Sequence, residues 1–115
     1  MAFLMLSSQK SLLTMRKNDL QFNYSCLLNE IQNLKKAEAA HSKEQQAIAD
    51  ASDTDWDMDA DGVYQALVKD EERITVEADS FQSQIQIVDQ EIAALKQLVS
   101  TDVKQATQLG LLGGS

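Results

Sequence analysis

The sequence predicts an all-α fold, a long antiparallel hairpin of two helices in a coiled coil that is packed in a homo-oligomer or a helical filament. Three observations lead to this prediction. The 115 residues contain no proline, which would interrupt a helix. Apolar residues recur at heptad spacing along two arms of the chain. One short Asp-rich segment separates the two arms. We therefore expect a single helical-hairpin domain over residues 1–115.

The second arm carries the clearer heptad pattern and is predicted to be helical over residues 61–108. Mostly apolar residues, interrupted by Glu71 and by Asp102 at the end, fall on both core positions of the repeat for about six heptads, which is the pattern of a coiled-coil seam. A strand would instead alternate with a period of two. The core positions predicted for this arm are Leu67, Ile74, Phe81, Ile85, Val88, Ile92, Leu95 and Val99.

The first arm repeats the pattern with more polar interruptions and is predicted to be helical over residues 7–50. His41 and Ile48 continue one core position, and Glu38 and Gln45 continue the other. The intervening residues are mostly Lys, Asn, Gln, Glu and Ala, which suit a solvated helix face. The apolar core positions predicted for this arm are Leu13, Leu20, Tyr24, Leu27, Ile31 and Leu34.

The break between the arms is predicted to be an acidic turn over residues 51–60. The net charge of the chain is -8, and residues 50–79 hold eleven of its 18 acidic residues against two basic ones. Alternating aspartates favour turns because their side chains bond to nearby backbone groups. Residues 109–115 contain three of the four glycines and are predicted to form an apolar tail that frays from the second helix.

Several apolar residues lie outside the predicted seam. A narrow two-helix seam leaves them uncovered, and exposed apolar patches usually mark an interaction surface. We expect one tip of the hairpin, formed by both termini, to be apolar and the other to be acidic. The candidates for filament contacts are Leu4, Leu6, Leu12, Phe22, Leu28, Val76, Ile87, Leu98, Leu109 and Leu112.

A calcium site is one interpretation of the acidic turn. Asp57, Asp59 and Asp61 followed by glycine match the first half of an EF-hand loop, and Asp53 and Asp55 could supply further ligands. The second half fails, because the position that requires a bidentate Glu is a valine. The alternative is a solvated acidic tip whose aspartates cap the next helix, and this interpretation is preferred.

Other singular residues have structural interpretations. Trp56 is expected to fold back over the open end of the hairpin rather than to anchor a partner. Cys26 flanks the seam and is expected to be a small packed side chain. His41 is interpreted as a polar core residue that sets register, in preference to a ligand or a pH switch. No phosphate loop, nucleophile elbow or zinc spacing is present, so we expect no enzyme and no resident cofactor apart from possible calcium.

Charge and hydropathy restrict the classes of partner that this chain is expected to bind. An acidic chain without a basic run is not expected to bind nucleic acid, and no stretch is apolar enough for a membrane span. The segment MAFLML is too short for a secretory signal and is followed by basic residues, so no cleaved signal peptide is expected. The chain itself is the expected partner, although another protein is possible.

The pattern resembles secreted helical polymer subunits, namely the type III secretion needle proteins and the paired terminal helices of flagellins. The resemblance rests on the segments 7–31 and 85–112 and on a composition rich in Gln, Ser, Asn and Ala. It implies that the terminal helices pack in a filament core and that the turn, Asp53 to Asp61, points outward. The residues that it would place near the filament axis are Leu4, Leu6, Leu13, Leu109 and Leu112. Needle proteins usually have a proline-containing turn, which this chain lacks.

Two functions are carried forward. The first is a structural, self-assembling subunit of a bacterial extracellular filament or tube, with apolar termini inward, the acidic turn outward, and export to the cell surface or medium without a cleaved signal. The alternative is a coiled-coil adaptor or chaperone-type binding module that forms a homodimeric four-helix bundle and is located in the cytoplasm. One version of this alternative has a weak calcium site in the turn.

Overall fold

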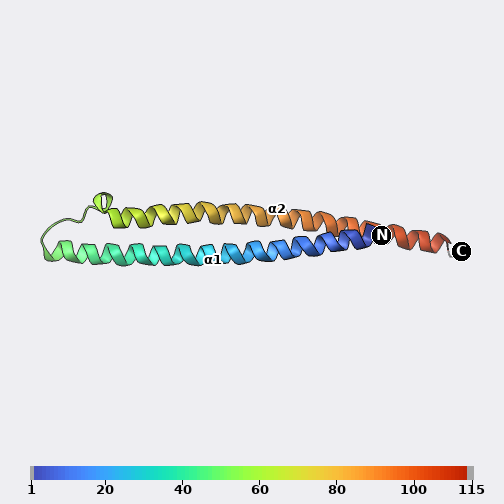
Figure 1. The fold of residues 1–115 in the computed structure, drawn as a ribbon, viewed down its shortest axis with the longest axis horizontal. Coiled ribbons are helices and arrows are strands. Elements are labelled where there is room, and N and C mark those ends of the chain that lie inside the picture. The colour runs from blue at the N-terminus through green and yellow to red at the C-terminus, as the bar shows by residue number, and fades with distance from the viewer. Residues whose placement is uncertain (1, 114–115) are drawn as a thin grey trace. The chain divides into compact units, whose positions relative to one another are not determined.

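The computed structural model describes residues 2–113 and, of these, the side chains of residues 4–105 and 107. Helix α1 spans Ala2–Ala51 and helix α2 spans Gly62–Gly113, with a single 3-10 turn, η1, at Met58–Ala60 between them (Figure 1). No strand occurs within residues 2–113. The predicted all-α fold, a hairpin of two long helices, is confirmed.

The chain divides into two compact units. The loop unit comprises residues 23–81, and so contains the second half of α1, the loop and the first part of α2. The terminal unit comprises residues 1–22 and 82–115, and so contains the first part of α1 and the remainder of α2. Within each unit one segment of α1 lies against one segment of α2.

The helix boundaries differ from the predicted ones mainly at the ends of the chain. Helix α1 begins at Ala2 instead of residue 7, and α2 continues to Gly113 instead of ending at residue 108. The predicted tail is therefore helical through Gly113, because an isolated glycine lowers helix propensity by only about 1 kcal/mol and does not by itself end a helix. None of the helices over the described residues is long and apolar enough to cross a membrane.

The seam of the terminal unit follows the heptad positions. Leu20, Val88 and Ile92 are buried, and the other predicted core residues of this unit, Leu13, Ile85, Leu95 and Val99, are half-buried. A cross-helix ion pair flanks the seam, in which Lys17 Nζ lies 2.6 Å from Asp89 Oδ1.

The seam of the loop unit departs from a strict heptad as it approaches the loop. Ala49 is only 5% exposed, whereas Ile48, which the heptad count places in the core, is 52% exposed. An α-helix has 3.6 residues per turn, so a straight helix rotates by about 20° per heptad and moves the contact to the next residue. Ile74 and Ala78 are buried opposite α1. The remaining predicted core residues are half-buried, namely Tyr24, Leu27, Ile31, Leu34, Leu67 and Phe81.

Candidate functional site

Helix α1 ends in a Schellman motif that turns the chain into the loop. The Thr54 N–H donates to the Ala49 carbonyl at 2.8 Å, and the Asp53 N–H donates to the Asp50 carbonyl at 3.3 Å. This is the pair of bonds that defines the motif. The residue that must adopt the left-handed conformation is Asp53, with a φ of 53°. Glycine is preferred at this position because it has no Cβ to clash with the backbone.

Asp61 caps the start of α2 and organises the end of the loop. Its Oδ1 accepts hydrogen bonds from the Val63 and Tyr64 backbone N–H groups, each at 3.0 Å. These are two of the donors that have no partner inside the helix. Asp57 caps η1 in a similar way, because its Oδ1 accepts from the Asp59 N–H at 3.1 Å. The preferred interpretation, in which loop aspartates cap the next helix, matches this geometry.

The second carboxylate oxygen of Asp61 joins both helices. His41 Nε2 on α1 lies 2.7 Å from Asp61 Oδ2, and Trp56 Nε1 donates to the same oxygen at 3.0 Å. The Tyr64 N–H bond, followed by the His41 and Trp56 bonds, lowers the pKa of Asp61 to about 2. Asp61 is therefore ionised at neutral pH and can only accept hydrogen bonds, so His41 Nε2 must carry a hydrogen.

Trp56 packs back onto α2, as the sequence predicts. Its ring meets the Tyr64 ring edge to face, with centroids 5.3 Å apart and an interplanar angle of 88°. We call His41, Trp56, Asp61 and Tyr64 the loop clasp. The loop clasp connects the loop to both helices. His41 supplies the contact with α1 through one specific partner, Asp61, in addition to occupying a core position.

The aspartates proposed as calcium ligands do not converge. Within the described residues no three carboxylate, imidazole or thiol side chains are placed to hold a metal ion. Both oxygens of Asp61 and one oxygen of Asp57 already accept hydrogen bonds inside the loop. Asp53, Asp55 and Asp59 are exposed. The EF-hand likeness thus extends to sequence spacing but not to the arrangement of the carboxylates.

A second polar cluster lies deeper in the loop unit, between α1 and α2. Glu38 Oε1 is buried and has no hydrogen-bond partner among the described residues. Burial raises the pKa of Glu38, the neighbouring Glu71 carboxyl raises it further, and the charge of Lys35 lowers it. Lys35 Nζ lies 3.8 Å from Glu71 Oε1, which partly balances the two acids. The heptad count places Glu38 at a core position, but it cannot show that a second acid lies opposite.

In the terminal unit the two helices leave a shallow apolar groove beside the seam. The groove has a volume of about 450 Å³. Its lining residues are Gln9, Leu12, Leu13, Glu91, Ala94 and Leu95. Leu12 was predicted as a contact residue outside the seam, and it is exposed at the edge of this groove.

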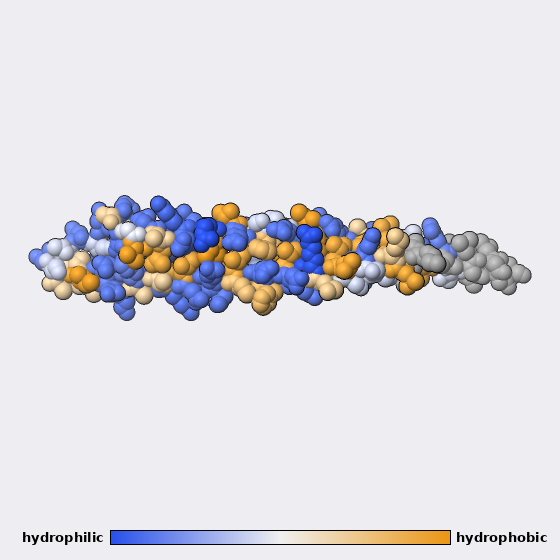
Figure 2. Space-filling view, viewed as in Figure 1, coloured by the Kyte–Doolittle hydropathy of each residue, from blue (hydrophilic) through white to orange (hydrophobic). Residues whose placement is uncertain are grey.

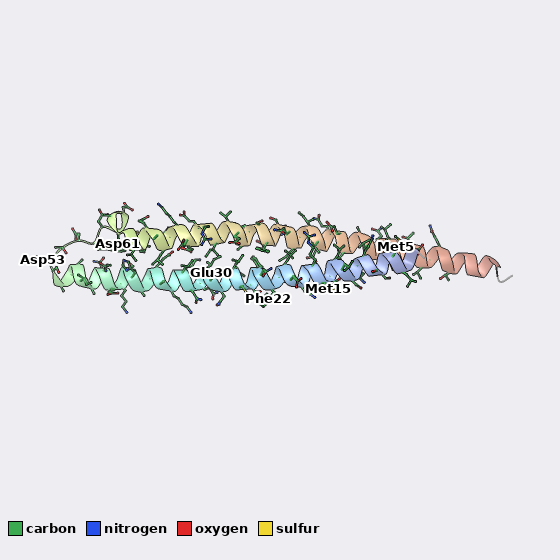
Figure 3. All side chains as sticks on the ribbon, viewed as in Figure 1. Met5, Met15, Phe22, Glu30, Asp53 and Asp61 are labelled. Atoms are coloured by element: carbon green, nitrogen blue, oxygen red, sulfur yellow. The ribbon has the colours of Figure 1, made fainter. Side chains whose placement is uncertain are left out.

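The apolar residues predicted to lie outside the seam are mostly exposed. In the terminal unit this holds for Leu4, Leu12, Phe22, Ile87 and Leu98, and in the loop unit for Leu28 and Val76. Met15, which the heptad analysis did not select, joins them, and Figure 3 shows Met15 and Phe22 on the edge of α1 that faces away from α2. Leu6 is half-buried. The side chains of Leu109 and Leu112 lie outside the described residues.

Cys26 differs from its expected role. It is a free, exposed thiol in the loop unit rather than a packed side chain. The reason is rotational: it directly precedes the seam residue Leu27, and one residue rotates a helix by about 100°. Adjacency in the sequence therefore placed it beside the seam but not in it.

Comparison with known proteins returns no relative. No protein-family model matches the chain, and neither a curated protein nor a solved structure matches it significantly.

Proposed function

We propose that this chain is a structural, self-assembling subunit, a helical hairpin that packs against copies of itself in a bacterial extracellular filament or tube. The apolar ends of the helices face inward in this assembly, and the acidic loop faces outward. In this proposal the subunit is exported to the cell surface or the medium.

The exposed apolar surface carries this proposal. Large apolar side chains lie outside the seam in both units, and orange apolar residues lie in patches among blue polar ones over the surface seen in Figure 2. Monomeric proteins rarely expose extended apolar patches, whereas subunits of assemblies do. The exposed carboxylates of Asp53, Asp55 and Asp59 suit a loop that stays in water.

Negative-stain electron microscopy of concentrated protein tests the proposal, with light scattering on the same sample. We expect fibres or tubes, and removal of residues 1–6 and 109–115 should disperse them. A monomer or dimer that forms no fibres at any concentration would contradict the proposal.

A second function, a coiled-coil adaptor or chaperone-type module, is favoured by one observation. The apolar groove beside Leu12 and Ala94 has the form that accepts the apolar face of another helix. In this case two hairpins form a four-helix bundle or receive a partner helix. The truncation separates the two functions, because a filament should dissociate whereas an adaptor should remain a dimer and keep its partner.

A further inference from the structure

An exposed stripe on α1 in the terminal unit repeats the spacing of a second coiled-coil seam. Its positions are Ser8, Leu12, Met15, Asp19 and Phe22, which follow one another by four, three, four and three residues. This is the alternation of core positions in a heptad repeat. All five side chains are exposed, Phe22 by 69%, and they lie on a different face from the seam residues Leu13 and Leu20. We call these five residues the α1 stripe.

The charges on and beside the α1 stripe indicate what covers it. Asp19 occupies a core position of the stripe, and Arg16 lies one turn before it at the edge. Neither side chain forms an ion pair with another described residue. Like charges that face each other between helices are destabilising, whereas opposite charges select orientation. The stripe thus presents one positive and one negative charge between Leu12 and Phe22.

We propose that two copies of the chain pair antiparallel through their α1 stripes about a two-fold axis near Lys17, an inference that rests on the proposed self-assembly. In an antiparallel coiled coil the two kinds of core position face each other, so Leu12 of one copy meets Phe22 of the other and Met15 meets Asp19. The interface is isologous, with the same patch used by both copies.

The charge pattern selects this orientation. The antiparallel register gathers two arginines and two aspartates around the two-fold axis, where Arg16 of each copy reaches Asp19 of the other. A parallel pairing in register would instead place Asp19 against Asp19 at the core of the interface, with both carboxylates desolvated. The stripe is therefore complementary to itself in one orientation only.

Sedimentation velocity from micromolar to near-millimolar concentration tests the pairing. Phe22→Ser, Arg16→Glu and Asp19→Arg should each weaken dimerisation by about tenfold or more. The double variant R16E/D19R restores two positive and two negative charges and should return to within about threefold of the original affinity. The control substitutions on α2, Gln86→Ser and Lys96→Glu, are at exposed positions away from the stripe that are not among the proposed contact residues, and they should leave dimerisation unchanged.

The outcomes separate this inference from the proposed function. If the unaltered chain stays monomeric throughout, both are overturned. If it associates and the stripe variants have no effect, the chain assembles through another surface and the α1 pairing is wrong. If the single charge reversals weaken association but the double variant does not recover it, the antiparallel register is wrong. Circular dichroism of each variant verifies that α1 and α2 remain folded.

Discussion

Ile74 and Val76 allow a direct test of which face of α2 is buried. They are two residues apart, yet Ile74 is 2% exposed and Val76 is 69% exposed. Ile74→Ala removes three buried carbon groups, which corresponds to about 2.4 kcal/mol at about 0.8 kcal/mol each. The cavity left behind adds to this, so we expect a loss of about 2–4 kcal/mol in the free energy of unfolding. Val76→Ala should change it by less than about 0.5 kcal/mol.

Urea unfolding, followed by circular dichroism, measures both variants at a low protein concentration and again at a high one. With a denaturant dependence of about 1–2 kcal/mol per molar, Ile74→Ala should lower the midpoint by roughly 1–4 M. If this variant is unfolded without urea, Ile74→Val, with an expected loss of about 0.5–1.5 kcal/mol, replaces it.

Equal losses for the two alanine variants, or a larger loss for Val76→Ala, would refute the placement of the seam. A loss for Val76→Ala that grows with protein concentration would instead report that another copy covers this face. The same pair of variants therefore tests both the position of the seam between α1 and α2 and the contact of the outer face of α2 with another copy.

Four further predictions concern the loop unit. Asp53→Gly should raise the free energy of unfolding by about 0.5–1 kcal/mol in urea titrations, because glycine relieves the left-handed conformation. The pKa of Asp61 is about 2 in the folded state against an ordinary value of 3.8, so its contribution to stability is complete above about pH 4 and is lost as the pH falls toward 2. Asp61→Asn should flatten this pH dependence of stability, which Trp56 fluorescence measures during unfolding. The pKa of Glu38 is raised in the folded chain, so the ionisation of this carboxyl lowers the stability of the fold as the pH rises above 4.5. Glu38→Gln should therefore be more stable than the unaltered chain at pH 7, with a smaller difference at pH 4. Millimolar calcium should leave the thermal midpoint unchanged, because Asp61 and Asp57 already accept hydrogen bonds, and a midpoint that rises with calcium and falls with chelator would contradict this.

The fold could be predicted from the sequence because its determinants are local and periodic. Residues such as Leu20, Ile74 and Val88 recur at heptad spacing, and a heptad repeat places them on one helix face whatever lies opposite. The heptad count becomes less accurate over many turns of α1, because near the loop Ala49 is buried in place of the expected Ile48. The helical period of 3.6 residues is slightly longer than the 3.5 residues that a heptad assumes, so the contact rotates to the neighbouring residue over several heptads.

The loop clasp could be predicted only in part. The tendency of aspartates to cap helices depends only on neighbouring residues, so an aspartate cap at the start of α2 could be predicted. The His41–Asp61 contact joins residues twenty positions apart. Their meeting depends on the conformation of the whole loop, including the left-handed Asp53 and the turn η1. The Glu38–Glu71 pair was missed for a related reason, since a heptad count assigns faces but not the partner across the seam.

Multi-angle light scattering over a concentration series measures the self-assembly of the chain itself. We expect a mass that rises with concentration past the dimer, with fibres in the most concentrated samples. A mass that stays at 12.8 kDa, that of one chain, at every concentration would contradict it.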